Sequence, residues 1–405
     1  MLEPMLAFVA MSPVVTPIEY GLPPAWRYLT KFAYFAGLAM VIGTTVVHSL
    51  VLRPALKAHG AEPRDAEILR GRSGIALVGA GLVFLVALYP QLAGKVARAG
   101  DGKPFGQALE PGNVWAYLMA PAPVGIPLGV MVLIQFATYA LCSLLLVSLV
   151  LPSMRRHIDG LARSAAIGTA LASVMLSVSG DLVARDIDGW MNRIPSYVHV
   201  LSGTTWVGSI AALAVIGTAH RRLSPDAGIV WAHMWKRFSR IAQLCVGGII
   251  VSGLWMVWHV VSSPSQLFTT TFGRLLLLKI LLVVSLLLVG LVNEYVLMPR
   301  IARLRAEGDR RGLFALAAQH FPRTVVIEAL IGLAVLIVLP FLNGSARAEA
   351  GVPEPIVTAR MFVATAGLLI IVVASLAINV RLQASAERRA VDRDPLHEPA
   401  GTRER

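Results

Sequence analysis

Residues 272–301 read FGRLLLLKILLVVSLLLVGLVNEYVLMPRI, and this stretch decides the class of fold. Between Leu275 and Val292 the only charged side chain is that of Lys279. A helix needs about 20 mostly apolar residues to cross a hydrocarbon core of roughly 30 Å. Strands of a membrane barrel would be about 10 residues long with a period of two, which this stretch lacks. It therefore predicts a membrane-spanning α-helix.

Runs of the same kind recur on the N-terminal and C-terminal sides of this segment. Hydrophobic residues make up 56% of the chain and charged residues only 15%, whereas soluble domains carry about 25% charged residues. The mean hydropathy is +0.69. We therefore expect an all-α, polytopic membrane bundle with about nine spanning helices. The expected spans are residues 29–52, 74–94, 124–151, 164–183, 197–219, 239–261, 274–298, 323–342 and 360–380.

The net charge of +13 reports topology here rather than a nucleic-acid partner, because the basic residues sort by loop. Loops rich in Lys and Arg face the cytoplasm. We therefore expect the N-terminus outside and the C-terminus in the cytoplasm. Basic residues follow the first, third, fifth and seventh spans: Arg53, Lys57 and Arg72; Arg155, Arg156 and Arg163; Arg221, Arg222 and Lys236; Arg300, Arg303 and Arg305.

Three regions follow from this topology. Residues 1–28 are expected to form an external arm, and residues 29–382 the transmembrane bundle. Residues 383–405 are charged and poor in aromatic residues, which predicts a disordered cytoplasmic tail. Three inward-running spans end in similar sequences: VLRPAL at 51–56, VLPSMRR at 150–156 and VLMPRI at 296–301. A proline beside basic residues is a common helix stop, so we expect all three helices to end there.

Four segments in order resemble the copper resistance protein D family. They are SYVHVLSGTTWVGSI from residue 196, KRFSRIAQLCVGGIIVSGLW from 236, FGRLLLLKILL from 272 and RTVVIEALIGLAVLIVLPFLNGSAR from 323, so that residues 196–347 form the family-like core. The resemblance implies a protein of the bacterial cytoplasmic membrane that handles copper, commonly by moving it inward. It also implies a periplasmic copper-binding protein as a partner, besides the lipid bilayer.

Two histidines are the leading candidate metal ligands. In the expected topology, His199 lies at the outer end of the fifth span and His259 at the outer end of the sixth. Met256 shares a helical face with His259. Two imidazoles and a thioether suit copper. Asp181 stands where the family often has a histidine, after Ser179 and Gly180, and is a harder candidate ligand.

Other interpretations of the histidine pair stay open at this point. His199 and His259 are also residue types that ligate b-type haem, which would make the protein a membrane redox protein. Alternatively, the chain delivers copper to another protein without transporting it. Two interfacial histidines among headgroups and Trp rings are the simplest structural interpretation. His48 and His220, near the inner face, are expected to be interfacial too.

A few polar residues inside the spans mark a transport pathway or a structural ion pair. They are Lys279, Asn293, Glu294 and Glu328. A charged side chain at a helix centre costs about 2.5–3.5 kcal/mol on insertion scales, so each is expected to face the bundle interior or to reach the interface. We expect Glu328 to pair with a Lys or Arg, and Asn293 to form a hydrogen bond between helices.

Motifs of several enzyme classes are missing from the sequence. It contains no G-x-x-x-x-G-K-[ST] loop for nucleotides, no H-E-x-x-H helix and no nucleophile elbow. We therefore expect a protein that is not an enzyme and does not hydrolyse ATP. Cys142 and Cys245 fall inside expected spans, where a cysteine is usually a small hydrophobic residue.

Overall fold

The computed structural model describes residues 17–58, 62–99, 102–121, 125–175, 187–316, 321–353, 355, 361, 363–375 and 377. The long helices carry the bundle: α1 Ala25–Val46, α3 Pro63–Arg98, α6 Leu128–Val147, α8 Ile158–Val174, α9 Ile187–Gly217, α10 Ala227–Val260, α12 Thr271–Val292 and α15 Phe321–Val338. Short helices lie at their ends: α2 Arg53–Ala58, α4 Phe105–Ala108, α5 Pro111–Leu118, α7 Pro152–Arg155, α11 Gln266–Thr269, α13 Met298–Ala306, α14 Arg310–Phe314 and α16 Ala346–Glu349.

The predicted fold class is confirmed. Seven helical stretches of the described residues are long and apolar enough to cross a membrane, and each overlaps a predicted span. The predicted span 164–183 corresponds to α8, but residues 176–186 lie outside the described part. The predicted span 360–380 overlaps a shorter apolar helix, Val363–Ser375. The number of spans, their orientation and the domain boundaries stay predictions, and the tail 383–405 lies outside the described residues.

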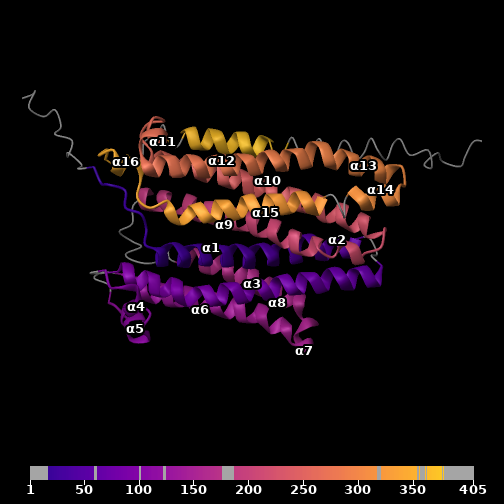
Figure 1. The fold of residues 1–405 in the computed structure, drawn as a ribbon, viewed down its shortest axis with the longest axis horizontal. Helices are drawn as coiled ribbons and strands as arrows, with labels where there is room; N and C mark the ends of the chain where they lie inside the picture. Colours follow the sequence, from indigo (N-terminus) through magenta and orange to yellow (C-terminus); the bar gives the residue numbers. More distant parts are fainter. Residues whose placement is uncertain are drawn as a thin grey trace, which may run out of the picture.

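The long helices run side by side, with α1 near the middle of the bundle (Figure 1). On one side of α1, the helices α3, α6 and α8 share a buried core that includes Phe84 and Tyr139. On the other side, α9, α10, α12 and α15 share a second core. Helix α1 contributes to the first core, and the helical residues that directly follow it, Val47–Leu52 and α2, contribute to the second, so this continuous stretch joins the two halves.

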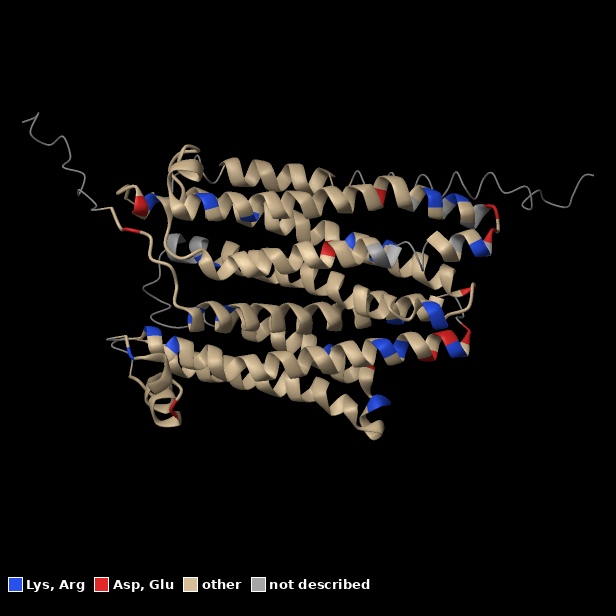
Figure 2. Ribbon diagram, in the orientation of Figure 1, with Lys and Arg blue, Asp and Glu red and all other residues tan. Residues whose placement is uncertain are grey.

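Charged residues gather at the two ends of the bundle, and most of its length is uncharged (Figure 2). One end carries α11 and α16, with α4 and α5, and is the expected outer end (Figure 1). The other end carries α2, α7 and α14 and is the expected cytoplasmic end. This distribution is the one that a bilayer imposes, because charges are costly only in the hydrocarbon layer.

The α1–α9 crossing brings two backbones unusually close. A Cβ atom built on Gly43 would overlap the backbone of Gly208, and one built on Gly208 would overlap the carbonyl of Ala39. Ser209 Oγ also donates to the Gly43 carbonyl over 3.5 Å. Without a hydrophobic force between helices in lipid, such contacts between small residues are a main source of helix association.

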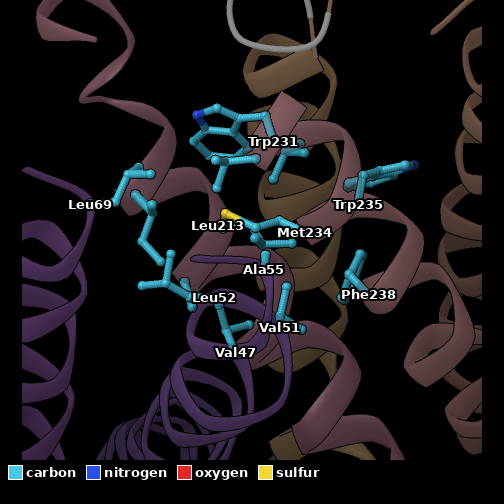
Figure 3. Close-up of a cluster of buried hydrophobic side chains, with 14 of the residues drawn as sticks. Val47, Val51, Leu52, Ala55, Leu69, Leu213, Trp231, Met234, Trp235 and Phe238 are labelled. Carbon is cyan, nitrogen blue, oxygen red and sulfur yellow. The ribbon is translucent and has the colours of Figure 1, made fainter. Parts of the chain in front are cut away.

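The second core is densest near the expected cytoplasmic end. Met234 of α10 is completely buried there, between side chains of α1, α2, α3 and α9 (Figure 3). These surround it in the close-up: Val47, Val51, Leu52, Ala55, Leu69, Leu213, Trp231, Trp235 and Phe238. A fully buried residue of this kind fixes the relative position of several helices, because a packed interior has little free space.

The expectation that inward-running helices end at their prolines is confirmed at Pro152, where Leu151 is extended after α6 and its last turn, and is wrong at the other two. Pro54 lies in α2 and Pro299 in α13, and in each case a π-helical segment continues the preceding helix up to the proline's short helix. The π-helical segments are Val47–Leu52 and Asn293–Leu297. Proline lacks an N–H and clashes with the carbonyl four residues earlier, and a wider turn removes that clash. The chain therefore widens its helix instead of ending it.

Loop residues close the expected outer end. Glu349 accepts hydrogen bonds from the backbone N–H groups of Thr271 and Phe272 at 2.7 and 2.8 Å, where the positive end of α12 favours a carboxylate. Tyr20 donates to the Phe341 carbonyl over 2.7 Å. Burial, and then the charge of Glu349, raises the pKa of Tyr20 above its ordinary value.

Candidate functional site

His259 near the end of α10 has a fixed ring. Its Nδ1 lies 2.9 Å from the Trp255 carbonyl oxygen, which can only accept, so Nδ1 carries the hydrogen. In the neutral ring, Nε2 then has a free lone pair. This Nε2 atom is buried and has no hydrogen-bond partner among the residues that the structure describes. Metal-binding histidines commonly donate their other ring N–H to a backbone carbonyl in this way. The ring is prepared to bind a metal ion or a proton donor.

His199 on α9 lies against α10 rather than facing outward. Its Nδ1 is 3.1 Å from Ser252 Oγ, and a Cβ on Gly253 would approach its ring at 3.3 Å. The glycine therefore leaves room for the imidazole between the two helices. Lys279 of α12 is near enough for its charge to act on His199. The ring is half-buried at a junction of three helices.

His199 of α9 and His259 of α10 lie at different heights along the axis of α10. His199 faces Ser252, and His259 follows Ser252 by seven residues, or about 10 Å of helix rise. Within the described ranges, no three His, Cys, Asp or Glu side chains gather closely enough to hold a metal ion. The arrangement therefore suits two successive binding positions better than one shared site.

The other predicted ligands are placed as follows. Met256 is half-buried one turn before His259 on α10, where residues three apart are neighbours. Asp181 lies outside the described residues. Trp255 packs its ring against that of His259, with the ring centres 5.3 Å apart. Met256 and Trp255 are thus neighbours of His259 on the same helix, and the metal role of these residues stays a prediction.

Asn293 and Glu328 meet in the bundle interior. Asn293 Nδ2 donates to Glu328 Oε1 over 2.6 Å, joining α15 to the π-helical segment that follows α12. Their exposed fractions are 1% and 3%. Asn293 Oδ1 is buried without a partner. The predicted hydrogen bond of Asn293 between helices is therefore present, and its acceptor is a carboxylate.

Glu294 belongs to an adjoining polar group. It accepts a hydrogen bond from Ser239 Oγ of α10 over 2.6 Å, and Ser239 Oγ in turn accepts from Gln243 Nε2 over 3.4 Å. Polar contacts thus run from α10 to α12 beside the Asn293–Glu328 pair. The π-helical segment thus directs two successive polar residues to different helices: Asn293 contacts α15 and Glu294 contacts α10.

Lys279 lies far from this group along α12. It precedes Asn293 by 14 residues, or about 21 Å of helix rise. In the described part of the chain, neither Lys279 nor Glu328 takes part in an ion pair. Glu328 has an amide partner in place of the expected Lys or Arg. Whether these residues belong to a transport pathway stays a prediction.

His48 is a polar site that sequence reasoning placed at the interface, and that expectation is wrong. The side chain is 2% exposed. It contacts Ser73 of α3 and Asp159 of α8 at 2.9 and 3.0 Å. A usable signal was the shared spacing: His48 precedes Pro54 by six residues, as Asn293 precedes Pro299. Cys142 and Cys245 are buried and free, within the two hydrophobic cores.

Comparison with known proteins identifies the relatives of this bundle. Residues 232–342 match the model of the family described as Copper resistance protein D. The matched region contains His259, Asn293 and Glu328, whereas His199 precedes it. No solved structure matches the chain.

Two curated proteins are similar to the chain. "Copper transport protein CutJ" of Bacillus subtilis (strain 168) is 28% identical over 329 residues, which cover 79% of this chain and 53% of that protein. "Inner membrane protein YebZ" of Escherichia coli (strain K12) is 30% identical over 149 residues, covering 36% of this chain and 46% of that protein. This chain thus spans about half the length of the curated relatives it matches. The chain is therefore similar to copper resistance protein D over residues 232–342, and it is a multi-pass protein of the bacterial inner membrane.

Proposed function

We propose that this protein transports copper across the cytoplasmic membrane and that His259 Nε2 is a first ligand at the outer end. The observation that carries the proposal is the buried Nε2 without a partner, in a ring whose other nitrogen is held by the Trp255 carbonyl. The match of residues 232–342 to a copper resistance family supports copper as the ion.

The side chains around His259 have the chemistry for copper. Imidazole and thioether ligands suit Cu(I), and Met256 supplies the thioether one turn away. His199 of α9, which faces α10 at Ser252, provides a second imidazole position deeper in the bundle. Copper binds first at His259 and then at His199. Each position must bind copper weakly enough to release it to the next. A periplasmic copper-binding protein delivers the ion to the first position.

The polar groups beyond the bundle centre serve the inner half of the route. The free Asn293 Oδ1, together with the carboxylates of Glu328 and Glu294, offers oxygen ligands in a region otherwise lined by apolar residues. Buried polar atoms inside a membrane span are costly and commonly mark ion pathways. Transport by this route uses an existing gradient and requires no reaction catalysed by the protein.

Two other functions are compatible with the same histidines. A b-type haem needs two imidazoles facing one iron, and the offset of His199 and His259 along α10 disfavours this function. A factor that hands copper to another protein would bind copper without carrying it across. Metal analysis and flux measurement separate these possibilities.

The test uses the full chain purified in detergent and then reconstituted into liposomes. Copper and iron are counted by mass spectrometry, and copper uptake is followed with an internal chelating dye. His259→Ala is expected to lower both bound copper and uptake at least tenfold. His157→Ala, which removes an exposed histidine at the other end of the bundle, is the matched control and should behave as the unchanged protein.

Each other outcome points to a different function. Stoichiometric iron with a haem spectrum would replace copper transport with a redox role. Bound copper without uptake would indicate a delivery factor. Uptake that persists unchanged in His259→Ala would remove His259 from the route.

A further inference from the structure

A buried polar cluster at the expected cytoplasmic end is centred on His48. The imidazole lies in the π-helical segment Val47–Leu52 and is 2% exposed. Its Nδ1 lies 2.9 Å from Ser73 Oγ of α3, and its Nε2 lies 3.0 Å from Asp159 Oδ1 of α8. Arg53 Nε pairs with Asp159 Oδ2 over 2.8 Å. Side chains of α3 and α8 thus hold the two ring nitrogens in hydrogen bonds.

The partners allow the ring to gain a proton without losing a hydrogen bond. An ionised carboxylate only accepts, so Nε2 carries a hydrogen toward Asp159. Nδ1 faces a hydroxyl, which either donates to the neutral ring or accepts from the protonated ring after its O–H turns away. Ser73 is therefore compatible with both protonation states. A histidine placed only for packing would not need a partner of this kind on each nitrogen.

The cluster also has a connection to water. The Asp159 side chain is 41% exposed at the expected cytoplasmic end. The charged groups acting on His48 are Asp159 of α8, Arg53 of α2 and Arg70 of α3. Asp159 is the negative charge beside the imidazole, 3.0 Å from Nε2, and its exposed carboxylate connects the cluster to water.

The chain contains a similar junction that has no imidazole. Asn293 occupies the corresponding place in the other π-helical segment, six residues before a proline. It also donates to a carboxylate from a neighbouring helix, that of Glu328. An asparagine is therefore sufficient to join two helices at such a segment. The imidazole of His48 adds a property that the junction alone does not require.

We propose that His48, with Ser73 and Asp159, forms a proton-binding site that exchanges its proton with the cytoplasm and links proton movement to ion transport. The proton comes from cytoplasmic water and is held on Nδ1, while Nε2 keeps its hydrogen toward Asp159. The coupling to copper rests on the proposed transport function. The binding and exchange of the proton do not.

The decisive variant is His48→Asn, which replaces the imidazole by the residue that the chain uses at the corresponding junction. The first measurement is nuclear magnetic resonance of the full chain in nanodiscs with nitrogen-labelled histidine. One buried ring, absent from the spectrum of His48→Asn, is expected to change its protonation between about pH 5 and 8. Asp159→Asn should weaken its proton binding about tenfold, because the stabilising negative charge is lost. A His48 ring that keeps one protonation state throughout would overturn the site.

The second measurement follows the internal pH of liposomes during copper uptake. Uptake by the unchanged protein is expected to move protons, and His48→Asn should reduce proton movement per copper at least fivefold. The control is His220→Asn, which changes a histidine bonded only locally to the Gly217 carbonyl at the same end. Equal proton movement in His48→Asn would overturn the coupling. Absence of copper uptake by the unchanged protein would contradict the transport function, while the resonance titration would still decide the proton site.

Discussion

Gly43 of α1 and Gly208 of α9 lie back to back, so close that a Cβ atom on either would overlap the other helix's backbone. This crossing joins the half of the bundle that contains His48 and Asp159 to the half that contains His199 and His259. Helix α1 is part of one hydrophobic core, and its continuation through Val47–Leu52 and α2 is part of the other, so a shift at this crossing would move both polar sites.

Gly43→Ala is therefore expected to destabilise the protein. Backbone atoms, unlike a side-chain tip, cannot turn aside, and overpacking typically costs about 1–3 kcal/mol. Thermal unfolding in detergent measures the effect. The matched control is Gly79→Ala in α3, where a Cβ meets nothing within 4 Å and better helix propensity should leave stability equal or slightly higher. Equal melting temperatures for the two variants would contradict the tight crossing.

Asn293→Leu is expected to destabilise the bundle through Glu328. The carboxylate would stay buried without its 2.6 Å donor, and a hydrogen bond to a charged group contributes about 1.5–3 kcal/mol. Adding Glu328→Leu should recover part of the loss, since the uncompensated group is then removed. A double-mutant cycle from denaturant unfolding measures the coupling. Additive losses from the two single variants would show that the pair does not interact energetically.

Asp65→Ala is expected to loosen the expected cytoplasmic end. The Asp65 side chain is 1% exposed and accepts from Ser224 N and Ser224 Oγ at 3.1 and 2.5 Å. Removing the acceptor leaves buried donors unpaired, at a cost of about 1–3 kcal/mol. Hydrogen exchange should increase at Ser224. Glu67→Ala, an exposed change two residues away, is the control. Unchanged exchange in Asp65→Ala would contradict the role of this contact.

Tyr20 predicts a pH effect at the expected outer end. Its neutral phenol donates to Phe341, and burial raises its pKa, with Glu349 adding to the rise. The unfolded-state value is about 10. Because the folded-state pKa lies higher, the contribution to stability is present below about pH 10 and disappears as pH rises through the folded-state pKa. The tyrosinate absorbance of Tyr20 is the part of the signal that Tyr20→Phe lacks. In an alkaline titration it should therefore appear at a higher pH than that of an ordinary tyrosine. Ionisation at the ordinary pH would refute the expectation.

Sequence reasoning found much of the bundle but only part of the candidate site. His259 was identified through a family resemblance, and its position near the end of a helix followed from the apolar run before it. That its Nε2 atom is buried without a partner depends on which side chains surround the helix. That Ser252 contacts His199 depends on how α9 and α10 pack together. Asp159 was not singled out at all.

The sequence by itself determined that this chain forms membrane-spanning helices and approximately where most of them lie. Hydrophobicity over about 20 residues is a local property. In a bilayer such a segment forms a helix, because a helix is the only conformation in which one segment satisfies all its own backbone hydrogen bonds. Only the tertiary structure decided that His48 meets Asp159, 111 residues away, and that Glu328 meets Asn293 rather than a Lys or Arg. Those pairs depend on which helical faces come together. Close approach at glycines and widened turns before prolines set that arrangement, and no single span encodes it.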